Sequence, residues 1–150
     1  MQRITTFLMF KDRAEEAMKF YVSVFKKSKI VSLTRQGSKV MGGTFKLEGE
    51  TFLCYEGGPH FSFSEGMSLF VHCKTQKEVD TFWKKLLAGG GRESMCGWLT
   101  DKFGVSWQII PEVLMEYLQD ENPARAKRVV DAMLQMKKID IAKLKQARKG

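Results

Sequence analysis

The sequence predicts an α+β fold of two consecutive modules followed by a helical tail. Each half of the chain up to Pro111 shows a strand pattern, then an amphipathic helix pattern, then a run of strand patterns. The break Gly57-Gly58-Pro59 separates the two halves. After Pro111, apolar residues recur at helical spacing. We therefore expect a single domain with module one over about residues 1–58, module two over about 64–111 and the tail over about 112–150.

The first module begins with an apolar, β-branched strand pattern over residues 4–10. Asp12 is placed to cap the following helix, with Glu15 three residues later in a capping-box arrangement. The helix is expected to end near Phe25. Its apolar stripe comprises Ala14, Ala17, Met18, Tyr21, Val24 and Phe25. Three further strands are expected over residues 29–35, 40–47 and 50–55.

The second module repeats this order, starting with an apolar strand over residues 67–73. Thr75 is expected to cap its helix, with Glu78 in the matching box position. The helix should end at the glycines of residues 89–91. Its buried stripe comprises Val79, Phe82, Trp83, Leu86 and Leu87. A short strand or loop is expected around residues 92–95.

The most informative stretch is a β-hairpin that ends at Pro111. Asp101 and Gly104 suit a sharp reversal between Thr100 and Val105. Pro111 ends the second strand because it has no N–H to donate to a ladder.

The register of this hairpin decides which side chains face a ligand. The turn places Leu99 opposite Ser106 and Trp98 opposite Trp107. Successive side chains of a strand point to opposite faces. The two Trp are therefore expected to pack beneath the helix, while Ser106 and Gln108 face the other side of the sheet.

Composition is that of a globular domain, with 43% apolar and 28% charged residues in 150. No apolar run is long enough to span a bilayer, and no membrane partner is expected. The N-terminus shows no signal-peptide pattern. Cys54, Cys73 and Cys96 are widely spaced and odd in number, which favours a reducing, cytoplasmic location.

The net charge of +8 is concentrated near the C-terminus. Residues 123–150 carry nine Lys or Arg against Asp131 and Asp140. Such a segment can bind nucleic acid, or it can be a solvated helical face. It contains no aromatic residue to stack on bases, so nucleic acid is not the expected partner.

Several motifs together resemble PhnB-like proteins of the glyoxalase, or vicinal-oxygen-chelate, superfamily. They are Ile4 to Phe10, Ala14 to Ala17, Phe20-Tyr21, Gly97 to Leu99, Asp101 to Gln108, and the tail Ala124 to Leu144 with its core at Met136 to Ile141. The group is also labelled 3-demethylubiquinone-9 3-methyltransferase. The resemblance implies paired βαβββ modules whose curved mixed sheets enclose a cleft, usually within a homodimer. The sequence lacks the Gly-rich strand-to-helix turn that an S-adenosylmethionine site would use.

The resemblance also implies a divalent metal held by His, Gln or Glu at one place in each of four strands. Those places fall at Thr5, at Leu53 (or Cys54 if the register slips by one), at Ser68 and at Gln108. Gln108 alone is a normal ligand of the superfamily. We therefore expect neither a metal at this position nor another cofactor.

The expected cleft combines aromatic bulk with neutral hydrogen-bonding groups, which suits a small, partly apolar ligand. Its predicted lining is Thr5, Phe7, Met9, Leu53, Ser68, Phe70, Leu99, Ser106 and Gln108, with His72 at the rim. His72 could be a base or an anion contact, or a structural histidine.

Three hypotheses for function follow. The first is a metal-free small-molecule-binding module that forms a homodimer. The second is a metal-dependent lyase, isomerase or dioxygenase with atypical ligands, so the sequence leaves open whether the protein is an enzyme. The weakest is a nucleic-acid-binding accessory protein that uses the basic tail.

Overall fold

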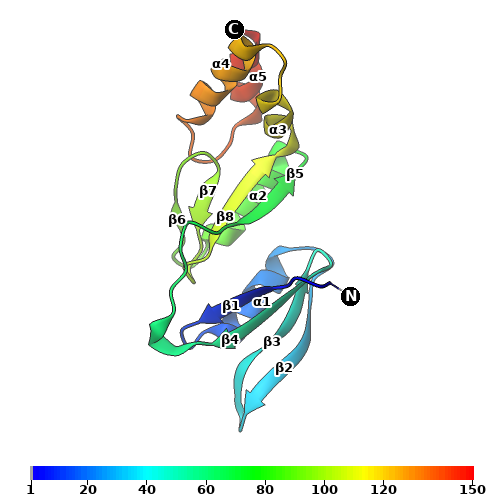
Figure 1. Cartoon of the computed structure of the whole chain (residues 1–150), viewed down its shortest axis with the longest axis vertical. Helices are drawn as coiled ribbons and strands as arrows, with labels where there is room; N and C mark the ends of the chain where they lie inside the picture. Colours follow the sequence, from blue (N-terminus) through cyan, green and yellow to red (C-terminus); the bar gives the residue numbers. More distant parts are fainter. Residues whose placement is uncertain (1) are drawn as a thin grey trace. The chain divides into compact units, whose positions relative to one another are not determined.

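The structure is a computed structural model that describes residues 2–150. The chain divides into two compact units, the first ending at Ser62 and the second running from Phe63 to Gly150. Each unit contains one four-stranded sheet, and the tail helices belong to the second unit (Figure 1). The expected α+β class is confirmed. Among the helices of the described residues, none combines the length and the apolar character needed to cross a membrane.

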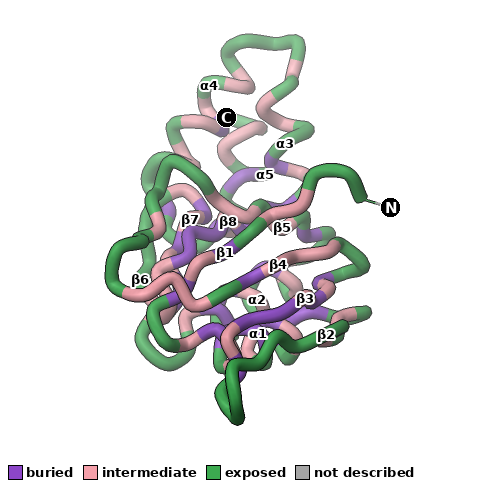
Figure 2. Tube along the Cα trace, turned by 60° about the horizontal axis from the view of Figure 1, so that its bottom comes forward, coloured by how far each residue is buried: buried purple, intermediate pink, exposed green. Residues whose placement is uncertain are grey.

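The first unit has βαβββ order, as the resemblance implied. Its elements are β1 (Thr6–Phe10), α1 (Ala14–Val24), β2 (Lys29–Gln36), β3 (Lys39–Leu47), β4 (Glu50–Glu56) and the 3-10 turn η1 (Gly58–His60). The strand order is β1-β4-β3-β2, with β1 parallel to β4 and the other pairs antiparallel. The edge strand β2 is exposed along most of its length (Figure 2).

Helix α1 covers one face of this sheet. Its predicted stripe is buried, because the side chains at helical spacing all meet the sheet. Tyr21 stacks on Phe45 with ring centroids 6.3 Å apart, and Phe45 stacks on Phe52 at 5.4 Å. These aromatic contacts anchor the helix to β3 and β4.

The predicted capping role of Asp12 is wrong. The N-cap of α1 is Arg13, which makes no capping bond through its side chain, and Asp12 adopts a φ of +58°. The backbone N–H of Ala14 donates instead to Oε1 of Glu56, 42 residues away in β4. A carboxylate from another strand thus satisfies the helix end that a local cap was expected to satisfy.

Two glycines allow the central strand β3 to approach its neighbours closely. A Cβ at Gly42 would lie 2.1 Å from the carbonyl oxygen of Cys54, and one at Gly43 would lie 2.2 Å from that of Ser32. No other residue fits either place without backbone movement.

The second unit repeats the sheet topology of the first. Its elements are β5 (Leu69–Cys73), α2 (Gln76–Leu87), β6 (Arg92–Glu93), β7 (Trp98–Thr100) and β8 (Ser106–Pro111). The strand order is β5-β8-β7-β6, with β5 parallel to β8. The predicted cap is confirmed, since the Thr75 side chain accepts from the Glu78 N–H at 3.2 Å.

Three tail helices complete the second unit: α3 (Glu112–Leu118), α4 (Pro123–Met133) and α5 (Ile141–Lys149). Helix α4 ends at Met133. The tail buries its apolar residues against the end of β8, in a cluster of Ile110, Leu114, Val129, Met136, Ile139 and Leu144. The backbone N–H of Gly97 donates to the Lys137 carbonyl at 2.8 Å, which fastens the tail to the start of β7.

Candidate functional site

The two faces of the second sheet are distinguished by the contacts of α2. The indole Nε1 of Trp83 on α2 donates to Oε2 of Glu93 at 2.8 Å. Glu93 pairs with Leu99 and Leu99 pairs with Trp107, so these three side chains share the α2 side. Leu99 and Trp107 are 1% and 2% exposed.

The opposite side of this sheet carries the main candidate site. We call it the Gln108 face and define it by Ser68, Phe70, His72, Trp98 and Gln108. Gln108 lies in β8 with Phe70 directly beside it in β5 and Trp98 directly beside it in β7. Its Nε2 donates to Oγ of Ser68 at 2.9 Å. The structure therefore places a neutral hydrogen-bonding pair next to two aromatic rings.

His72 extends the Gln108 face along β5. Its ring lies 4.8 Å from that of Phe70, and the residue is exposed. It pairs with Ile110, which is buried in the tail cluster. The tail thus covers the end of the sheet next to His72 and leaves the row around Gln108 uncovered by α2 or the tail cluster.

The predicted register of the hairpin is wrong by one residue. Trp98 pairs with Gln108, Leu99 with Trp107 and Thr100 with Ser106. A shift of one residue moves every side chain of the strand to the other face. Leu99 therefore lies in the core beneath α2, and Trp98 faces the candidate site instead.

The cause of this shift is a turn that closes at a different pair of residues than expected. Oδ1 of Asp101 accepts from the N–H of Phe103 at 2.8 Å and of Val105 at 3.0 Å, and the Asp101 N–H donates to the Val105 carbonyl. The loop therefore closes between Asp101 and Val105. Ser106 keeps the predicted parity but is only 3% exposed, so a ligand would not reach it directly.

The first unit presents a more apolar surface on the side of its sheet opposite α1. Phe7 pairs with Leu53, and Met9 pairs with Tyr55. Phe7 is 54% exposed, while Cys54 is buried on the α1 side. Thr5 immediately precedes β1 and follows the same alternation. The predicted residues of this module share one face, to which the structure adds Tyr55.

The superfamily's metal position does not fit the residues present. It would draw on Thr5, Leu53, Ser68 and Gln108, which offer two neutral hydroxyls, one amide and one hydrocarbon. None of these four side chains is a carboxylate, imidazole or thiolate that could offset the loss of water from a divalent ion. Among residues 2–150, no three His, Cys, Asp or Glu side chains gather in a group that could hold a metal ion.

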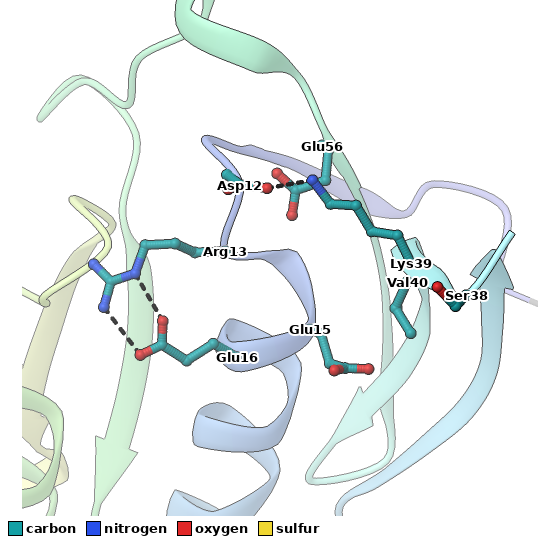
Figure 3. Close-up of a pocket in the computed structure, with 8 residues that line it drawn as sticks. All are labelled: Asp12, Arg13, Glu15, Glu16, Ser38, Lys39, Val40 and Glu56. Atoms are coloured by element: carbon teal, nitrogen blue, oxygen red, sulfur yellow. Dashed lines mark hydrogen bonds and ion pairs between the residues drawn. The ribbon is translucent and has the colours of Figure 1, made fainter. Parts of the chain in front are cut away.

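A separate hollow of about 310 Å³ lies at the start of α1 (Figure 3). Lys39 forms an ion pair with Asp12, which raises the pKa of the Lys39 ammonium, and Arg13 pairs with Glu16 at 2.7 Å. Oε1 of Glu56 accepts from the first turn of α1, while its buried Oε2 has no hydrogen-bond partner among the described residues. Most of the charged side chains here form ion pairs with one another, and Glu56 binds the backbone of the first turn. These residues therefore stabilise the start of α1.

Comparisons with known proteins agree with this architecture. The model of the family described as 3-demethylubiquinone-9 3-methyltransferase matches residues 2–110. A PhnB protein from Bacillus cereus is 43% identical, with a TM-score of 0.68, over 73% of this chain and 99% of that chain. No curated protein matches. The tail helices lie beyond the residues that match the family.

More distant solved structures share the fold alone. A glyoxalase-related enzyme from Fulvimarina pelagi is 17% identical, with a TM-score of 0.54, over 76% of this chain and 91% of that chain. The fosfomycin resistance protein FosX from Listeria monocytogenes, solved with Mn(II) and a sulfate ion, is 12% identical. Its TM-score is 0.54, over 71% of this chain and 89% of that chain.

Proposed function

The chain belongs to the PhnB-like family described as 3-demethylubiquinone-9 3-methyltransferase, within the glyoxalase superfamily, and we propose that it is a small-molecule-binding module. In this proposal the Gln108 face binds a neutral, partly apolar ligand, with no metal at the superfamily's position. A fold or a family description does not fix chemistry, so the proposal rests on the residues of the face.

The observation that carries the proposal is the bond between Gln108 and Ser68 beside Phe70 and Trp98. Small-molecule sites combine apolar walls with a few placed polar groups. Here the polar groups are uncharged and already oriented by one another. An ion bound in this row would lose water without gaining an opposite charge. A neutral ligand would replace its hydrogen bonds to water with hydrogen bonds to Gln108 and Ser68.

A fragment screen tests this proposal. Neutral aromatic and aliphatic fragments would be screened by ligand-observed NMR against the wild type and the Phe70→Ala variant. Met115→Ala provides the matched control, since Met115 on α3 is 40% exposed and Phe70 is 37% exposed. Hits that bind the wild type and Met115→Ala but not Phe70→Ala support the proposal. Hits that bind all three proteins equally, or an absence of hits, contradict it.

The runner-up function is a metal-dependent lyase, isomerase or dioxygenase. It would need a divalent ion held largely by Gln108. Without a carboxylate or imidazole the ion would lose hydration that the protein does not replace. The donor set therefore favours the binding module.

We further propose that the protein is a homodimer. Exposed Phe7 and Tyr55 on the first sheet support an apolar contact with a second copy. The tail gives no such support, because Val129, Met136 and Leu144 are buried within their own unit. Light scattering at micromolar protein tests the proposal, and a monomer at all concentrations would contradict it.

A cytoplasmic location is also part of this proposal. It is supported by three unpaired thiols, Cys54, Cys73 and Cys96. Fractionation of cells that express the protein under its own promoter would test it, and recovery from an oxidising compartment would contradict it.

A further inference from the structure

The ligand class can be narrowed from the hydrogen-bonding pattern of the Gln108 face. We infer that this face binds a planar, uncharged molecule that carries a hydrogen-bond donor directly beside an acceptor, as a cyclic amide does. The inference rests on the proposed function and goes beyond it by naming the chemistry of the ligand.

The first step is the hydrogen-bonding capacity left on the pair. Gln108 Nε2 donates to Ser68 Oγ at 2.9 Å. An amide also has a carbonyl oxygen that accepts, and a serine hydroxyl has a hydrogen to donate. Both residues are only partly buried, so a ligand can reach these atoms. The pair therefore presents the acceptor Oε1 beside the donor hydroxyl of Ser68, and the second N–H of Gln108 Nε2 is a further donor.

This complementarity does not depend on which way the amide points. Reversing the Gln108 amide makes its NH₂ the free donor and the Ser68 oxygen the free acceptor. In either orientation a single hydrogen-bonding group on the ligand would leave one protein group unpaired. A ligand with an N–H next to a carbonyl would satisfy both.

The second step is the shape of the row. Phe70 and Trp98 lie directly opposite Gln108 on its two neighbouring strands. Side chains paired across strands have Cβ atoms about 5 Å apart. Aromatic rings on both sides of the amide therefore offer flat surfaces, against which a planar molecule makes more contact than a branched one.

The third step is charge. The row of Phe70, Gln108 and Trp98, together with Ser68, contains no ionisable group. The neighbouring titratable side chains on this side of the sheet are peripheral, with His72 farther along β5 and Arg92 on the edge strand β6. A carboxylate or ammonium placed over Gln108 would lose water without gaining a counter-charge. The row therefore selects an uncharged ligand.

Three bicyclic probes of similar outline test this inference. Carbostyril is a lactam with adjacent N–H and C=O, N-methylcarbostyril lacks the donor, and quinoline lacks the carbonyl and the N–H. Affinities would be measured by NMR titration of the full chain. We expect carbostyril to bind about tenfold more tightly than either relative. This difference in affinity corresponds to the loss of about one to two net hydrogen bonds.

Variants assign this preference to the named atoms. Gln108→Leu keeps the approximate size and removes the amide, so the tenfold preference should disappear. Ser68→Ala removes the partner hydroxyl and should reduce the preference, which provides a second test if Gln108→Leu does not fold. Met115→Ala should leave the preference unchanged.

The outcomes separate this inference from the proposed function. Equal binding of all three probes at the Gln108 face would overturn the donor–acceptor inference and leave the binding module standing. A preference that persists in Gln108→Leu and in Ser68→Ala would overturn the inference as well. So would an absence of binding by all three probes, whereas the binding module itself is judged by the fragment screen.

Discussion

Changing Asp101 should strongly destabilise the second unit, because its carboxylate holds the β7–β8 hairpin. Asp101 is 3% exposed. Oδ1 accepts from the backbone N–H of Phe103 and Val105, and Oδ2 accepts from the indole Nε1 of Trp107 at 2.8 Å. One side chain thus fixes the length of the turn and the position of the largest core residue of the hairpin.

The expected magnitude follows from these bonds. Asp101→Ala removes the acceptors and leaves the Val105 N–H and the indole N–H buried without their partner. The cost should be about 3–5 kcal/mol of unfolding free energy. Asp101→Asn can keep the two backbone bonds while it turns an NH₂ toward the indole N–H. Its cost should be smaller, about 1–3 kcal/mol.

Tryptophan fluorescence during urea unfolding provides the assay, because Trp83, Trp98 and Trp107 all lie in the second unit. Trp107→Phe removes the indole donor, so Asp101→Asn should cost less in that background than in the wild type. A cost below about 1 kcal/mol for Asp101→Ala, or the same cost for Asn with and without the indole, would refute this account of the hairpin.

Three further predictions concern packing, the tail and the thiols. Gly43→Ala should cost about 1–3 kcal/mol because its Cβ would lie 2.2 Å from the Ser32 carbonyl, whereas Gly66→Ala in a loop should be nearly neutral by thermal unfolding. Gln76→Ala should speed hydrogen exchange in the tail, because the Gln76 side chain donates to the Ile139 carbonyl at 2.9 Å and accepts from the Ile141 N–H at 2.8 Å. Unchanged exchange would show that these two bonds do not hold the tail in place. Burial raises the pKa of the Cys54 thiol to about 11 and that of Cys73 to about 12. Iodoacetamide near pH 8 should therefore label the more accessible Cys96 first, by mass spectrometry. In the unfolded chain the thiols of Cys54 and Cys73 ionise near pH 9, while in the folded protein they stay protonated. The free energy of unfolding should therefore fall as the pH rises from about 9 to 12. A constant free energy of unfolding over this range would contradict the prediction.

The fold was predictable because local patterns report burial directly. The helical stripe around Tyr21 and the alternation through Trp107 both mark side chains that the structure buries. The same alternation placed Phe7 and Leu53 on one face, and the register of β1 and β4 agrees. The binding roles of these residues stay predictions.

The register of the hairpin was not predictable from alternation. It depends on how many residues the loop takes up, and Asp101 determines that number through bonds to Phe103 and Val105. An Asp–Gly pattern suits turns of more than one length. The one-residue difference exchanged Trp98 and Leu99 between the core and the candidate site.

Contacts that are distant in sequence also left no local signal. Glu56 supports the start of α1 from a strand 42 residues away. The helical spacing of apolar residues after Pro111 predicted a buried face, but it did not indicate that Ile110 and Leu114 would provide the surface for Val129 and Leu144. Such partners follow from tertiary structure and not from periodicity.

The most direct test of the metal-free binding site is the metal content of the purified protein. Protein prepared without affinity metals would be analysed by elemental analysis and then titrated calorimetrically with zinc, nickel, manganese and magnesium. We expect substoichiometric metal and no tight binding, because Thr5, Leu53, Ser68 and Gln108 provide no charged ligand. Stoichiometric metal that is lost in Gln108→Ala would contradict the account and favour the metal-dependent enzyme.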